Sequence, residues 1–224
     1  MIKIKSLLLS SIIACGTITN VQASNIDVIA SISGTSNYIS RGMTQSNDKS
    51  AVFVEGTVLY GGFFGGLWAS NVEFEGADAD SEIDLYLGYA TVLGNLETSL
   101  SYTRFLYPNS NDIPTLDEVA IELVYPIDNL SIGGKYIWGV YTENDGEKYD
   151  YYEGFASYDF DILKLNSSAG SMQDTGDNFT IGISKDFEIS DTVLNLDLSY
   201  TKFYDDNTSS NDQENVYATI TYAF

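Results

Sequence analysis

The chain has 224 residues, with 32 Asp and Glu against 10 Lys and Arg, no His and one Cys, so its formal net charge is −22. Charge of this sign repels the phosphates that nucleic-acid-binding proteins neutralise, and a chain without His lacks the Ser-His-Asp triads, imidazole bases and His-ligated zinc of common hydrolases. The composition therefore argues against a nucleic-acid partner and against an enzyme. Because 44% of the residues are hydrophobic and 19% are charged, we expect one folded domain and not a disordered acidic tail.

The first 23 residues have the pattern of a secretory signal peptide. Lys3 and Lys5 precede a short apolar run at 7–14, and the small residues before position 24 suit signal peptidase. We therefore predict a signal peptide at 1–23, which is removed, and a mature domain at 24–224, whose net charge becomes −24 once the two lysines are lost. One alternative stays open, because the run IIAC at 12–15 also resembles a lipoprotein cleavage box. Cleavage there would leave Cys15 lipidated at the N-terminus, in place of cleavage after Ala23.

The remaining chain alternates apolar and polar residues with a period of two, which is typical of strands with one apolar face. Leu194, Leu196 and Leu198, for example, alternate with polar residues. No apolar run after the signal reaches 18 residues, so we expect no membrane-spanning helix. The pattern predicts about twelve strands, at 25–39, 52–60, 63–72, 82–93, 96–106, 117–125, 130–141, 149–158, 162–171, 177–187, 192–203 and 214–224.

The predicted connections alternate in length along the chain. Tight turns are expected at 61–62, 94–95, 126–129, 159–162 and 188–191, and longer polar loops at 40–51, 73–81, 107–116, 142–148, 172–176 and 204–213. Short turns at one end and long loops at the other indicate an all-β fold, a transmembrane antiparallel up-and-down β-barrel of about 12 strands with its short turns and both termini in the periplasm. The alternative is a soluble barrel or sandwich whose apolar face points inward.

Hairpin register supports one continuous apolar face. Residues that flank a two- or four-residue loop lie opposite each other on the same face of the sheet. The flanking pairs are all apolar or aromatic: Tyr60 with Phe63, Leu93 with Leu96, Tyr125 with Leu130, and Tyr158 with Leu163. This is what a single closed surface requires.

The charges indicate which face meets lipid. A charged side chain at the bilayer midplane costs about 2 to 4 kcal/mol for Arg or Lys and about 0 to 1 kcal/mol near the interface. On the apolar face charges occur only near strand ends, at Arg104, Asp117, Asp150, Lys185, Lys202 and Glu214. The other face carries its charges in mid-strand, so these side chains are predicted to line a lumen: Asp27, Glu55, Asp84, Glu97, Glu122, Lys135, Glu153, Lys164 and Asp197, with Arg41 pointing inward near the external mouth by the parity of the first strand.

Three segments resemble a known family. The runs SNYISRGMTQS at 36–46, GLWASNV at 66–72 and EIDLYLGY at 82–89 are similar to successive blocks of the TorF family, a proteobacterial group of porin-like secreted barrels. Beyond residue 90 only the strand rhythm and the terminal Phe224 match. The resemblance implies a barrel in the bacterial outer membrane. It brings no established substrate or catalytic residue with it.

The predicted lumen suggests transport. Its seven acids outnumber its basic residues, and rings of Asp and Glu favour cations, so we expect a porin-like channel for passive diffusion of small solutes that prefers cations. The alternative is a plugged structural or interaction barrel that presents acidic extracellular loops, because about twelve strands enclose a narrow lumen that inward side chains can close. Arg41 also has two interpretations. In the functional one it opposes the acids at a constriction, and in the structural one it forms a buried ion pair with a neighbour such as Glu55 or Asp84.

The expected partners follow from this placement. They are outer-membrane lipid and lipopolysaccharide, small-molecule or ion solutes, and the barrel assembly machinery, for which the last strand with its terminal Phe224 resembles an assembly signal. Arg104 and Lys202 are expected to meet lipid phosphates. We predict no enzyme, cofactor, catalytic residue or metal site. The acidic loops leave calcium binding open as an alternative, although they lack the spacing of an EF-hand.

Overall fold

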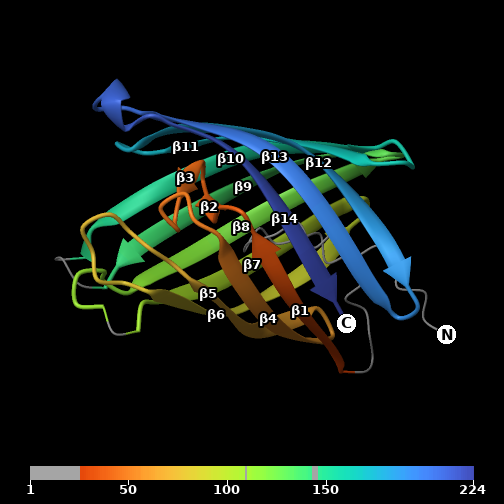
Figure 1. Cartoon of the computed structure of the whole chain (residues 1–224). Coiled ribbons are helices and arrows are strands. Elements are labelled where there is room, and N and C mark those ends of the chain that lie inside the picture. The colour runs from red at the N-terminus through yellow and green to blue at the C-terminus, as the bar shows by residue number, and fades with distance from the viewer. Residues whose placement is uncertain (1–25, 109, 143–145) are drawn as a thin grey trace.

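The computed structural model describes residues 26–108, 110–142 and 146–224, so the predicted signal peptide and Cys15 lie outside the described residues. These residues form a closed barrel of twelve antiparallel strands (Figure 1). The strands are β1 (Asp27–Thr35), β4 (Ala51–Tyr60), β5 (Phe63–Asn71), β6 (Ser81–Leu93), β7 (Leu96–Leu106), β8 (Leu116–Ile127), β9 (Leu130–Tyr141), β10 (Lys148–Asp159), β11 (Lys164–Met172), β12 (Gly176–Ile189), β13 (Thr192–Asp205) and β14 (Gln213–Ala223).

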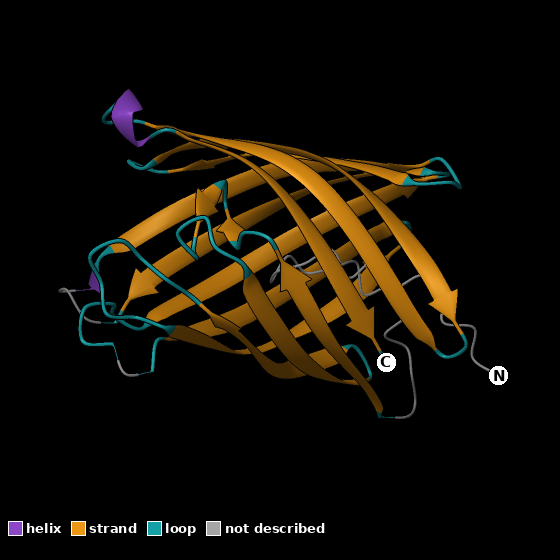
Figure 2. Ribbon diagram, in the orientation of Figure 1, coloured by secondary structure: helices purple, strands orange, loops and turns teal. Residues whose placement is uncertain are grey.

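Each strand pairs with its neighbours in sequence, and the first and last strands close the barrel. Ser31 lies opposite Ala223 and Thr35 opposite Thr219, and the backbone groups of Ala30 and Phe224 exchange two hydrogen bonds of 3.0 and 2.9 Å. Closure removes the free sheet edges that a bilayer does not tolerate. Strands make up most of the ribbon (Figure 2), and Ser209–Asn211 form a one-turn 3₁₀ helix. Among the described residues, no helix has the length and hydropathy needed to cross a membrane.

The connections follow the predicted alternation, with two corrections of register. The turn predicted at 126–129 is a two-residue turn at 128–129, so Tyr125 lies opposite Ile132 and not Leu130. Pro126 lacks a backbone donor but is tolerated near the end of a strand, and Asp128, at a φ of 52°, makes the tight turn. The loop predicted at 159–162 spans 160–163, so Tyr158 faces Leu165 in place of Leu163. Both shifts are by two residues and leave the apolar face unchanged.

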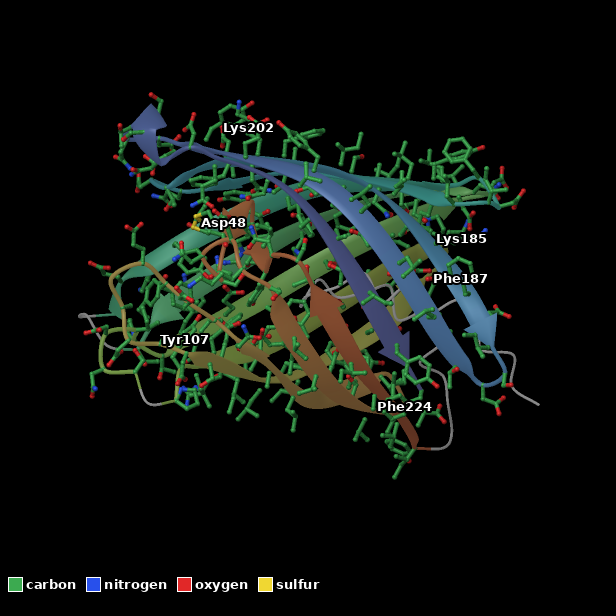
Figure 3. The ribbon with its side chains drawn as sticks, viewed as in Figure 1. Asp48, Tyr107, Lys185, Phe187, Lys202 and Phe224 are labelled. Atoms are coloured by element: carbon green, nitrogen blue, oxygen red, sulfur yellow. The ribbon has the colours of Figure 1, made fainter. Side chains whose placement is uncertain are left out.

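The apolar face points outward. Large hydrophobic side chains are exposed along every strand pair, and Leu87, in the middle of β6, is 60% exposed. The interpretation as a soluble barrel with an inward apolar face is therefore wrong, because a surface of this kind suits lipid and not water. Figure 3 places Lys185, Phe187 and Phe224 toward one end of the barrel and Asp48, Tyr107 and Lys202 toward the other. We call these the turn end and the loop end.

Candidate functional site

The first long loop folds into the barrel. Within it, β2 (Ile39–Ser40) and β3 (Met43–Thr44) pair as a small hairpin that lies between the walls near the loop end (Figure 1). We call residues 36–50 the inward hairpin. Its tip lies against β12 and β13, since a Cβ atom added to Gly42 would lie 2.7 Å from Asn178 Cβ and 3.2 Å from Phe203 Cβ, and the side chain of Arg41 at the tip reaches β8 and β10 on the opposite wall. The hairpin therefore crosses the lumen.

The local sequence explains this hairpin. Arg41 and Gly42 have φ values of 50° and 83°, the left-handed backbone that a two-residue hairpin turn needs. Asn37 holds the base of the hairpin, because its Nδ2 donates to Asp48 Oδ1 at 2.8 Å and its Oδ1 accepts from the Thr44 hydroxyl at 2.7 Å and the Ser46 hydroxyl at 3.1 Å. Many polar groups of the loop are thus satisfied within the hairpin, and the Thr44 amide donates to Gln213 Oε1 in β14 at 2.8 Å, which allows the loop to leave water.

Arg41 anchors the tip to the far wall. Its Nη2 donates to both carboxylate oxygens of Glu118 in β8, at 2.7 and 2.8 Å, and its Nη1 donates to the Tyr149 hydroxyl in β10 at 2.9 Å. The guanidinium also lies 5.0 Å from the ring centroid of Tyr151. Burial alone would lower the pKa of Arg41, but the charges and hydrogen bonds of Glu118 and Tyr149 together outweigh it, and the net shift of the pKa is upward. Arg41 is therefore a permanent cation within the lumen.

This geometry corrects two expectations about Arg41. The residue points inward because the loop folds back, and not by the parity of the first strand, which ends at Thr35. Of its two interpretations, the buried ion pair is present, but its partner is Glu118 and not Glu55 or Asp84. The parity of β8 places Glu118 inward, but nothing in the sequence indicated which carboxylate the loop would reach.

A second set of contacts joins the hairpin to β4, β5 and β6. The Tyr38 hydroxyl donates to Glu82 Oε1 at 2.8 Å, and the Tyr38 ring packs against Phe53 and Trp68, with centroids 5.1 and 5.4 Å apart. Tyr38 is 2% exposed and Glu82 is 1% exposed. Glu82 begins the predicted strand at 82–93 but was not among the predicted lumen residues. It is instead the first inward carboxylate of that strand.

Asp84 lies next to this contact and has no partner of its own. Its side chain points inward, as predicted, but it is 0% exposed, and neither carboxylate oxygen accepts a hydrogen bond. On the neighbouring strands it lies opposite Trp68 and Phe105, which have no oxygen or charge to offer. We call the set of Arg41, Glu82, Asp84 and Glu118 the lumen cluster. The three segments that carry the family resemblance meet in and around it.

The turn-end half of the lumen contains the other predicted residues, and it is more open. Lys135 pairs with Glu153 at 3.3 Å, Glu55 accepts a hydrogen bond from Tyr86 at 2.8 Å, and Asp197 accepts one from Ser199 at 2.7 Å. The strand registers also place the remaining predicted residues inward: Glu122 is buried, and three are half-buried, namely Asp27, Glu97 and Lys164. That these side chains line a conducting path stays a prediction.

The outer charges and the external loops form separate pairs. Arg104 and Asp117 form a bidentate ion pair on the outer face, with both nitrogen–oxygen distances at 2.7 Å. Lys49, at the end of the inward hairpin, binds Glu73 of the next loop at 2.6 Å, and this hydrogen bond lowers the pKa of Glu73. Among the described residues, no three Asp, Glu, His or Cys side chains are grouped so as to hold a metal ion.

Comparison with known proteins places the fold. No curated protein matches the sequence. The NanC porin is similar in structure, with a TM-score of 0.57 and 11% identity over 87% of this chain and 98% of the porin. An outer membrane channel from Pseudomonas putida F1 is also similar, with a TM-score of 0.55 and 12% identity over 88% of this chain and 94% of the channel. Together, this fold and the apolar outer wall place the chain in the bacterial outer membrane. Residues 19–223 match the family described as "Bacterial protein of unknown function (Gcw_chp)", and the chain belongs to that family.

Proposed function

We propose that the protein is a porin-like channel for passive diffusion of small solutes across the outer membrane, with a preference for cations. The observation that carries this proposal is the polar, partly solvent-exposed interior of the turn-end half. Glu97, Lys135, Lys164 and Asp197 are all inward and half-buried there, whereas the large apolar side chains face outward. Ionisable groups facing inward require water or partners, and the wall of a soluble core would not carry them.

The preference for cations follows from the inward charges. Glu82 and Glu118 add two carboxylates to the seven that the sequence predicted, while Arg41, Lys135 and Lys164 supply the positive charge. A pore wall with excess carboxylate lowers the energy of a cation and raises that of an anion. The inward hairpin narrows this path at the loop end, so we expect a small conductance.

A second candidate, a plugged barrel that presents acidic loops, has one observation in its favour. The rings of Tyr38, Phe53 and Trp68 form a buried cluster across the loop-end half, and Arg41 fastens the hairpin to the opposite wall. In this candidate the barrel serves as a support and the loops meet an external partner. Three further parts of the proposal are common to both candidates. The chain is a member of the TorF family, its surface contacts lipopolysaccharide, and the assembly machinery recognises Phe224.

Planar-bilayer recording from the purified chain separates the two candidates. The channel proposal expects stepwise conductance and a reversal potential in a salt gradient that shows cation preference. Deleting residues 39–44 should increase the conductance, because it removes the tip that crosses the lumen. A matched deletion in the external loop at 206–212 should leave it unchanged. Silence of both the intact chain and the 39–44 deletion would establish the plugged barrel, and an anion preference would refute the cation preference.

A further inference from the structure

Asp84 is a buried carboxyl group to which the described part of the chain offers no hydrogen-bond partner. Its side chain is 0% exposed, and both of its oxygens are without a donor or an acceptor. Arg41, the one cation of the lumen cluster, donates to both carboxylate oxygens of Glu118 instead. A negative charge in such a place is far more costly than a neutral group, and a buried carboxyl responds by keeping its proton.

The inward hairpin covers Asp84. Tyr38 of the hairpin donates to Glu82, which precedes Asp84 by two residues on the same face of β6. The Tyr38 ring also packs 5.4 Å from Trp68, which lies opposite Asp84 on β5. The burial of Asp84 therefore depends on the hairpin, and water that reaches Asp84 from the loop end has to displace Tyr38.

The other ionisable groups around Asp84 do not replace it in a response to rising pH. They are Tyr38 and Arg41 of the hairpin, Glu82 and Tyr86 of β6, Tyr107 after β7, and Glu118 of β8, whereas β5 and β7 present Trp68 and Phe105. Burial raises the pKa of Tyr38 and of Tyr107, and Arg41 stays a cation, so these groups keep their protons. Ionisation of Asp84 thus adds a negative charge beside Glu82 and Glu118 without a new partner for it.

We propose that Asp84 holds a proton while the inward hairpin is in place, and that loss of this proton releases the hairpin from the lumen. The released state lets water solvate the carboxylate and binds one proton fewer, so raising the pH favours release by up to about tenfold per pH unit. Lowering the pH keeps the hairpin in place. The consequence for transport rests on the proposed channel, whose loop end is then narrow at low pH and wider at high pH.

Trypsin cleavage after Arg41 measures release without requiring conduction. While the hairpin is in place, the Arg41 side chain is 19% exposed and bonded to Glu118, so the protease cannot engage it. The full chain in detergent is digested at several values between about pH 7 and 10, and each rate is divided by the rate on a short Arg-Gly peptide at the same pH. We expect this normalised rate to rise with pH, where it is steepest by about tenfold per pH unit.

Two variants assign the response to Asp84. Asp84→Asn cannot ionise, so its normalised rate should stay at the neutral-pH value of the wild type. Asp186→Asn is the matched control: Asp186 faces inward too but accepts a hydrogen bond from Asn195 at 2.6 Å, so its loss should leave the pH dependence intact. A normalised rate that does not change with pH, or an undiminished pH dependence in Asp84→Asn, would overturn the proposal.

Infrared spectroscopy of the wild type is the second measurement, should Asp84→Asn fail to fold. The C=O stretch of a protonated carboxylic acid should be present at neutral pH and decline over the pH range in which cleavage rises, and a band that does not change overturns the proposal. Bilayer recording keeps this inference separate from the channel. A barrel that releases its hairpin but never conducts loses the channel and keeps the proton-dependent release. One that conducts equally at every pH loses the release and keeps the channel.

Discussion

Replacing Arg41 with Ala tests whether the ion pair across the lumen holds the inward hairpin. The side chains of Arg41 and Glu118 are 19% and 5% exposed, so solvent screens their interaction little. Removing one partner of a buried pair leaves an uncompensated charge and costs about 3 to 5 kcal/mol. Here the remaining Glu118 would still accept from Tyr149 but would face Glu82 and Asp84 with no cation. We therefore expect Arg41→Ala to favour release of the hairpin by about two to four orders of magnitude.

Hydrogen exchange measures this release directly. The Gln45 amide donates to the Tyr38 carbonyl at 2.7 Å inside the hairpin, and its protection should fall in Arg41→Ala by roughly the same factor. Adding Glu118→Gln to Arg41→Ala should restore part of the protection, because it removes the unpaired negative charge of Glu118. Arg104→Ala is the control, since that pair lies on the outer face and is worth about 1 kcal/mol or less. Full protection in Arg41→Ala would refute the reasoning and show that the hydrogen bonds of Asn37, and not the ion pair, hold the hairpin in place.

Two further predictions concern the loops and the outer wall. The pKa of Glu73 is lowered by its hydrogen bonds from Lys49 and Asn47, so these contacts stabilise the folded loops above the ordinary Glu pKa and are lost as pH falls through the lowered value. An NMR titration should show the Glu73 pKa rising toward its ordinary value in Lys49→Met, and an unchanged pKa would contradict this. Leu87→Arg, in the middle of the outer face of β6, should reduce the free energy of folding into lipid vesicles by about 2 to 4 kcal/mol, whereas Leu93→Arg, beside the turn, should cost about 0 to 1 kcal/mol. Equal costs in urea titrations would contradict the lipid-facing assignment.

The sequence was sufficient to predict the barrel and its two faces, because alternation with a period of two reports directly on a wall between lipid and lumen. Leu87 and Asp84 show this: each faces the side that its parity predicts. The register errors at Tyr125 and Tyr158 arose where local turn chemistry decides the pairing. Neither error moved a side chain to the other face, because a shift of two residues preserves parity.

The candidate site was less predictable because it depends on contacts between distant segments. The run at 36–50 has the composition of an external loop, and its hydrogen-bonded base at Asn37 gives no periodic signal. Once the loop turns inward, Arg41 reaches Glu118, 77 residues away, and Tyr38 reaches Glu82, 44 residues away. A pattern confined to one strand cannot indicate which carboxylate such a loop will meet.

The inward hairpin links the width of the lumen to its charge. While the hairpin is in place, it contributes Arg41 to the lumen cluster, so one cation faces three carboxylates. If the hairpin is released, the lumen widens and loses that cation, and the carboxylates of β6 and β8 then face water without it. Under the proposed function a wider state is therefore also a more cation-preferring one. Conductance and cation selectivity should rise together in Arg41→Ala, whereas a hairpin that acted only as a steric obstacle would change conductance alone.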